Sequence, residues 1–135
     1  MRVQDLRVYQ RSVELRQAVF EASRAWPKEE RYALTDQARR SSRSVSANLA
    51  EAWAKRRYPK HFVAKLTDAL GEAEETLVWL EVAEECGYLD ATHRDNLTRS
   101  TRQLVGGLVK MMRHPDQWCG PAGLVREDAE LYDSD

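Results

Sequence analysis

The stretch TDQARRSSRSVSANLAEAW, residues Thr35–Trp53, says more about the fold than any other part of the sequence. Small and apolar side chains recur in it at intervals of three and four residues, and this spacing puts them on one side of a helix. The arginines of the stretch fall on the opposite side. The segment therefore predicts an amphipathic helix that packs closely against its neighbours through Ala38, Ser42, Val45, Leu49 and Ala52.

Prolines and capping residues set the predicted boundaries of this helix and of the one before it. Asp5 is the predicted N-cap of a first helix. That helix ends at Trp26-Pro27, because the residue before a proline is disfavoured in the α conformation. Thr35 is the predicted N-cap of the second helix, which Tyr58-Pro59 stops near Arg57.

Two further helices follow. Pro59 suits the first position of a third helix, whose apolar residues alternate by three and four as in a coiled-coil seam. Gly87 ends it, since glycine readily takes the left-handed conformation found after helix C-termini. Asp90 is the predicted N-cap of a fourth helix that ends at Pro115. We expect an all-α fold, an antiparallel up-down-up-down four-helix bundle of residues 1–115.

Residues 116–135 have a different composition. Turn-forming residues come first, and an acidic end without helical periodicity follows. We expect a C-terminal tail that is partly disordered and that becomes ordered only where Trp118, Leu124 or Leu131 finds a groove.

Length and composition limit the class of protein. The 135 residues suit one domain with its own core, and the net charge of −1 argues against a uniformly basic nucleic-acid-binding protein. No apolar run approaches the roughly 20 residues of a membrane span, so we expect no membrane association. Cys86 and Cys119 lie far apart in the sequence, which favours reduced thiols and a cytoplasmic location.

Charge is unevenly distributed along the chain. Residues 37–67 contain eight Arg and Lys residues against Glu51 alone, whereas residues 68–90 contain eight acidic residues and no Arg or Lys. The second and third helices would bring these two sets side by side in a hairpin. One interpretation is therefore ion pairing, within the chain or between subunits, of the arginines with Glu72, Glu74, Glu75 and Glu81.

The other interpretation is nucleic-acid binding. Four cations lie beyond the acidic stretch, at the expected turn between the second and third helices, where they form a compact basic tip with Tyr58 and His61. Phosphate groups are attracted to such clusters, although a solvated turn is the simpler alternative. The candidate nucleic-acid-binding residues are Arg39, Arg40, Arg43, Lys55, Arg56, Arg57 and Lys60.

Some apolar residues lie off the main seams. They indicate either a wider core or an interface between subunits, which is the usual role of a large exposed apolar patch. The candidate interface residues are Trp53, Val63, Leu70 and Trp79.

Catalytic and metal sites are not indicated. A di-iron site in a helical bundle needs Glu-x-x-His pairs, and His61, His93 and His114 do not follow a glutamate at that spacing. No Ser/His/Asp arrangement, Gly-rich phosphate loop or zinc-ligand spacing occurs. We expect a non-enzymatic protein with no metal, no cofactor and no small-molecule substrate.

Four segments together resemble the four-helix-bundle proteins called 23S rRNA-intervening-sequence proteins. The central pair is Tyr32-Ala-Leu-Thr-Asp-Gln37 and Arg39-Arg40-x-x-x-Ser44-Val45-x-x-Asn48-Leu49-Ala50-Glu51. The opening Asp5-Leu6-x-Val8-Tyr9-Gln10 and the turn Cys86-Gly87-Tyr88-Leu89 are similar to the same family. The resemblance covers about residues 3–113, and Ala52 stands where the family usually has glycine.

The resemblance implies four antiparallel helices, a ring-shaped homopentamer and a poorly defined biochemical role. Members occur in open reading frames inserted in 23S rRNA genes. A related branch comprises accessory proteins of diversity-generating retroelements, which act with a reverse transcriptase and nucleic acid. Two hypotheses follow. The chain is an oligomeric bundle that binds RNA or a ribonucleoprotein through residues 39–60, or it is a protein-interaction scaffold whose arginines form ion pairs between subunits.

Overall fold

The computed structural model describes residues 1–119, which form helices and turns without a strand. Four long helices make up most of this part of the chain: α1 (Arg7–Ser23), α2 (Leu34–Ala54), α3 (Pro59–Glu85) and α4 (Ala91–Arg113). Three short helices accompany them: η1 (Val3–Asp5), η2 (Lys28–Glu30) and α5 (Asp116–Cys119). The predicted all-α fold is confirmed at this level.

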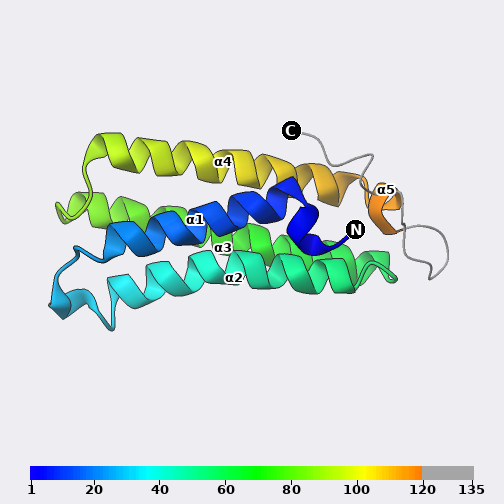
Figure 1. Ribbon diagram of the computed structural model, residues 1–135, viewed down its shortest axis with the longest axis horizontal. Coiled ribbons are helices and arrows are strands. Elements are labelled where there is room, and N and C mark those ends of the chain that lie inside the picture. Colours follow the sequence, from blue (N-terminus) through cyan, green and yellow to red (C-terminus); the bar gives the residue numbers. More distant parts are fainter. Residues whose placement is uncertain (120–135) are drawn as a thin grey trace.

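The long helices lie side by side along the long axis of the molecule, and each runs opposite to the one before it (Figure 1). α2 packs against α1 and α3, and α4 packs against the same two helices. The α1–α2 and α3–α4 connections lie at one end, which we call the loop end (residues 24–33 and 86–90). The α2–α3 connection lies at the other end, which we call the turn end (residues 55–58), together with η1 and α5.

Three predicted boundaries are confirmed. Pro59 is the first residue of α3. Gly87 has a φ of 79°, the left-handed conformation that glycine adopts without strain. The Asp90 carboxylate accepts a hydrogen bond of 2.7 Å from the backbone N–H of His93 and so caps α4.

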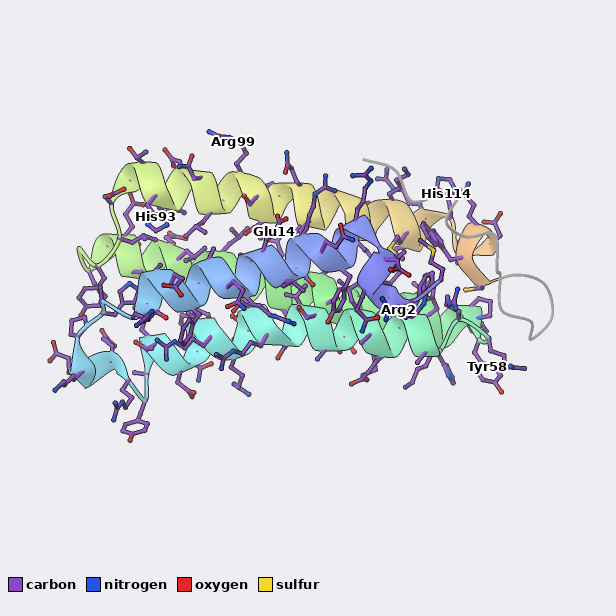
Figure 2. All side chains as sticks on the ribbon, viewed as in Figure 1. Arg2, Glu14, Tyr58, His93, Arg99 and His114 are labelled. Atoms are coloured by element: carbon purple, nitrogen blue, oxygen red, sulfur yellow. The ribbon has the colours of Figure 1, made fainter. Side chains whose placement is uncertain are left out.

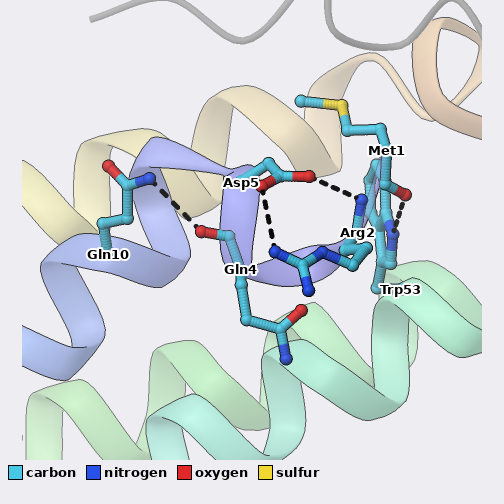
Figure 3. A network of polar contacts seen from close by, with 6 residues as sticks. All are labelled: Met1, Arg2, Gln4, Asp5, Gln10 and Trp53. Carbon is cyan, nitrogen blue, oxygen red and sulfur yellow. Dashed lines mark hydrogen bonds and ion pairs between the residues drawn. The ribbon is translucent and has the colours of Figure 1, made fainter.

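The other predicted boundaries are wrong by one to three residues. Asp5 lies in η1, where its side chain accepts a hydrogen bond of 2.9 Å from the backbone N–H of Arg2, and α1 begins two residues later (Figure 3). α2 begins at Leu34 with no side-chain cap, and Thr35 is buried. α2 also ends at Ala54 rather than near Arg57, because the N–H groups of residues 55 and 56 bond back onto α2 and close the turn before Pro59.

The predicted small-residue seam forms the centre of the core, since Ala38, Val45, Leu49 and Ala52 are all buried. Buried serines beside the seam tie α2 to both neighbouring helices. Ser46 bonds Ser12 of α1 at 2.9 Å, and Ser41 bonds Thr76 of α3 at 2.8 Å. Burial of these hydroxyls is tolerated because each has a partner.

The turn end is built around Trp53. Trp118 of α5 packs edge-on against Trp53, with 6.0 Å between the ring centroids. The indole N–H of Trp53 donates to the backbone oxygen of Met1 at 3.4 Å (Figure 3). Residues 116–119 of the predicted tail are therefore part of the packed structure. The predictions for the rest of the tail, including Leu124 and Leu131, lie outside the described residues.

None of the helices in residues 1–119 is long and apolar enough to cross a membrane. The same residues bring together no group of three or more His, Cys, Asp or Glu side chains that could hold a metal ion. Cys86 is exposed, Cys119 is buried, and both are free thiols.

Candidate nucleic-acid interface

A pocket of about 720 Å³ lies at the loop end, between the last turn of α1, the α1–α2 connection and the first half of α2. Asp36 is the single carboxylate among the side chains that line it. We call this pocket the cationic groove, because its lining includes six basic side chains: Arg24, Lys28, Arg31, Arg39, Arg40 and Arg43.

The α1–α2 connection forms one wall of the groove and is anchored to the body of the protein. Trp26 is buried, and its ring lies 6.4 Å from that of Tyr88 in the α3–α4 connection. The Tyr88 hydroxyl donates to the Glu30 carboxylate at 3.0 Å, and this bond raises the pKa of Tyr88 to about 12. The wall therefore has a defined position relative to α2.

Three guanidinium groups of the groove gather around one aromatic ring. Arg39 lies over Phe20 at 4.7 Å from the ring centroid, and Arg24 and Arg43 each lie at 5.9 Å from it. Arg39 is also held by Ser23, whose hydroxyl accepts from its Nε at 2.8 Å. The face of an aromatic ring attracts cations, so Phe20 partly offsets the repulsion among the three.

Within residues 1–119, five of the six groove cations form no ion pair; the exception is Arg24, which contacts Glu21 at 3.5 Å on the exposed surface. Arg40 donates to the neutral side chain of Gln37 at 3.3 Å. The groove thus collects positive charge that this part of the chain does not neutralise.

The predicted ion pairs of the α2 arginines with Glu72, Glu74, Glu75 and Glu81 are not formed within the described part of the chain. Glu74 instead pairs with Arg102 of α4 at 2.7 Å. Burial, followed by the charge of Glu75, raises the pKa of Glu72, and the charge of Arg40 only partly opposes this. Pairing between subunits stays a prediction.

The predicted basic tip divides into exposed and buried members. Lys55, Arg57 and Lys60 are exposed at the turn end, and Tyr58 lies at the extreme of the molecule, opposite the loop end (Figure 2). Arg56 differs, because only 8% of it is exposed. Its Nε donates to the Trp53 carbonyl oxygen at 3.0 Å, and its guanidinium lies 3.5 Å from the centroid of the Trp53 ring. Arg56 therefore contributes to the packing of the turn end, and its role as a nucleic-acid-binding residue stays a prediction.

Lys65, the next cation along α3, is paired with carboxylates, in contrast to the exposed cations of the tip. Its Nζ lies 2.9 Å from the Glu51 carboxylate and 3.7 Å from that of Asp68. The hydrogen bond with Glu51 lowers the pKa of Glu51 and raises that of Lys65. No such pair is present at the three exposed tip cations in residues 1–119.

The candidate interface residues also divide. Trp53 is only 8% exposed and is covered by Trp118 and Arg56 within the chain, so it offers little surface to another copy, and its role as an interface residue stays a prediction. Val63, Leu70 and Trp79 are half-buried and pack against the core from α3. Their outer surfaces are the part of the predicted interface that the monomer leaves open.

Sequence reasoning did not find the groove residues Arg24, Lys28, Arg31 and Tyr32. The acidic Glu29 and Glu30 stand between these cations and hide them in any count of charge along the sequence. In the structure the carboxylate of Glu30 is bound by Tyr88, and neither glutamate lines the groove. The fold of the α1–α2 connection therefore separates Glu29 and Glu30 from the groove cations.

The fold and the groove define an all-helical protein with four main helices and a concentrated cationic surface. The chain belongs to the 23S rRNA-intervening sequence protein family, whose model matches residues 4–110.

A solved structure of similar fold is a protein with unknown function from the S23 ribosomal protein family of Bacteroides thetaiotaomicron. Its TM-score is 0.70 at 24% sequence identity, over 78% of this chain and 95% of that one. The comparison with curated proteins found no match.

Proposed function

We propose that this protein is a non-enzymatic RNA-binding protein and that the cationic groove is its main contact with the phosphate backbone. The observation that carries the proposal is the collection of six Lys and Arg side chains around one pocket with a single lining carboxylate. Phosphate contacts supply most of the affinity of proteins for nucleic acids. The family is named for an intervening sequence of 23S rRNA, and RNA is the polyanion that this proposal takes as the ligand.

The exposed tip residues Lys55, Arg57 and Lys60 form a second contact in this proposal. α2 has 21 residues and is therefore about 30 Å long, and the groove and the tip lie toward its opposite ends. A short oligonucleotide would engage one of the two surfaces, and a longer RNA would reach both.

Fluorescence anisotropy with a labelled RNA oligonucleotide tests the proposal. We expect binding at low salt that weakens steeply as salt rises. Arg40 and Arg43 are candidates for replacement, because both lie at the groove surface and are exposed. The double variant R40A/R43A should bind at least about tenfold more weakly, and its slope of log K against log salt should fall by about 1.4, since each phosphate contact on a single strand contributes about 0.7.

The control is the double variant R99A/R113A, which removes the same charge from exposed positions on α4 that do not line the groove; Arg99 is labelled in Figure 2. This variant should retain the affinity and the salt slope. Absence of RNA binding at low salt by the unaltered protein would refute the proposal. Equal losses of RNA affinity in the two double variants would show that the groove is not the main contact.

We also propose that the protein forms a homo-oligomer, with a pentamer as the state implied by the family resemblance. Val63 and Leu70 are half-buried on one flank of α3 and Trp79 is half-buried on the opposite flank, and these apolar side chains support contacts between copies. The antiparallel up-down-up-down bundle would then present α3 to the neighbouring copy.

The free thiols of Cys86 and Cys119 support a reducing, cytoplasmic location.

A further inference from the structure

We infer that the cationic groove takes an unpaired nucleotide of single-stranded RNA, with the phosphate on the arginines around Phe20 and the base stacked on Tyr32. This inference rests on the proposed function and adds the form of RNA that the groove selects. The geometry supports it in two parts, one for the phosphate and one for the base.

The phosphate half of the site is already assembled. The Nε of Arg39 is occupied by Ser23, and the two terminal nitrogens of the same guanidinium have no partner within residues 1–119. Arg24 and Arg43 lie over the same ring of Phe20. Like charges gathered in one groove repel each other, and an anion bound by these arginines would relieve the repulsion and accept hydrogen bonds from their guanidinium groups.

The base half of the site is Tyr32. This residue lines the groove and is 87% exposed, more than any other large apolar or aromatic side chain in residues 1–119. It is not held out by a loose loop, because backbone bonds of 3.1 Å and 3.0 Å fix the residues on either side of it. An exposed aromatic ring beside a row of cations is the arrangement on which single-stranded nucleic acids stack their bases.

The volume of the groove suits a single nucleotide, and its lining favours single-stranded RNA over a duplex. A volume of about 720 Å³ falls within the range of pockets that hold a small organic ligand. In a duplex the bases are paired and stacked inside the helix, so a duplex can bring phosphates to the arginines but cannot place a base on Tyr32. The groove should therefore prefer single strands, whose bases are free to turn outward.

The test compares a labelled single-stranded RNA with a duplex of the same sequence, using the full chain and the variants Y32A and Y32F. Y32F is the matched control, because it keeps the aromatic ring on which a base would stack and loses only the hydroxyl. We expect the single strand to bind more tightly than the duplex. Y32A should bind the single strand about tenfold more weakly, with little change for the duplex, and Y32F should resemble the unaltered protein.

Photo-crosslinking with 4-thiouridine in the single strand gives a second readout, and the crosslinked peptide should contain Tyr32. Normal binding of both RNA forms by Y32A would overturn the inference while the proposed function stands. Absence of RNA binding by the unaltered protein would overturn both. If Y32A instead changes the mass measured by light scattering, the groove is a contact between copies of the chain, and the inference is wrong.

Discussion

At the scale of single residues, the chemistry of the groove depends on how one arginine is held. A flexible arginine must be ordered when it binds a phosphate, and this ordering opposes binding. Arg39 is ordered in advance by the Ser23 hydroxyl and the Phe20 ring. The Ser23 hydroxyl in turn donates to the Phe20 carbonyl oxygen at 3.0 Å, so the acceptor itself has a fixed orientation.

Replacement of Ser23 by alanine tests this pre-ordering. The change removes the acceptor for Arg39 and leaves the charge of the groove intact. An ordering cost of about 0.5–1.5 kcal/mol per side chain corresponds to roughly two- to tenfold weaker RNA binding. Anisotropy measures the affinity, and chemical denaturation should show a loss of stability of no more than about 1 kcal/mol.

Ser12 provides the matched control, because it is a second buried serine of α1 and bonds Ser46 rather than a groove residue. The variant S12A should lose stability by about 1 kcal/mol and keep its affinity for RNA. If S23A and S12A lose affinity equally, the effect of Ser23 is one of stability, and pre-ordering of Arg39 has no role in binding.

Arg56 is buried although the cations on either side of it in the sequence are exposed. Neighbouring cations in a sequence need not share a surface, since Arg56 stacks on Trp53 while Lys55 and Arg57 are exposed. Arginine suits this role because its planar guanidinium stacks on aromatic faces and loses less on burial than the ammonium group of lysine.

At the scale of helices, α5 is short but closes the turn end. α5 contacts α3, and its Trp118 is only 2% exposed and covers Trp53 of α2. Large aromatic side chains contribute much of the apolar area that a small core buries. Residues 116–119 are therefore part of the folding unit, although nothing in their sequence shows helical periodicity.

Replacement of Trp118 by alanine should lower the free energy of unfolding by about 3–5 kcal/mol, the usual cost of truncating a buried aromatic residue to alanine. A chain that ends at Pro115 should lose at least as much. Urea denaturation followed by circular dichroism measures both. Trp79 on α3 is only half-buried, so W79A should cost less than W118A, and the reverse order would contradict the assigned role of α5.

At the scale of the whole molecule, the proposed oligomer has two alternative surfaces through which copies would meet. The groove lies at the loop end, and the half-buried apolar residues lie on α3. An oligomer built through α3 would leave the groove open to RNA. An oligomer built through the groove would neutralise its arginines against carboxylates of a neighbouring copy.

Light scattering of two variants distinguishes these arrangements. The variant R39A/R43A should keep the mass of the unaltered protein, because the groove is free in the proposed assembly. L70E puts a charge at a half-buried position on α3 and should shift the mass toward the monomer, since an unpaired charge is costly to bury. Circular dichroism checks that L70E remains helical. The opposite pattern would support the scaffold hypothesis, in which the arginines form ion pairs between subunits.

Local patterns in the sequence were enough for the helices and for part of the candidate site. The period of Ala38, Val45 and Leu49 defines a buried stripe without reference to any other segment, and Pro59, Gly87 and Asp90 act on the backbone within a few residues. Arg40 and Arg43 could be placed on the opposite side for the same reason. These features were predictable because each depends on interactions within one or two turns of a helix.

Only the tertiary structure decided which of the charged side chains remain available to bind a ligand. The groove joins cations of residues 24–31 to those of residues 39–43, and its wall is positioned by Tyr88, far away in sequence. Arg56 is buried against Trp53, which is also covered by Trp118, 65 residues later in the chain. The sequence by itself determined which faces of the helices are apolar and which are charged. Packing between distant segments determined which of those charges are buried, paired or exposed, because such contacts have no local period.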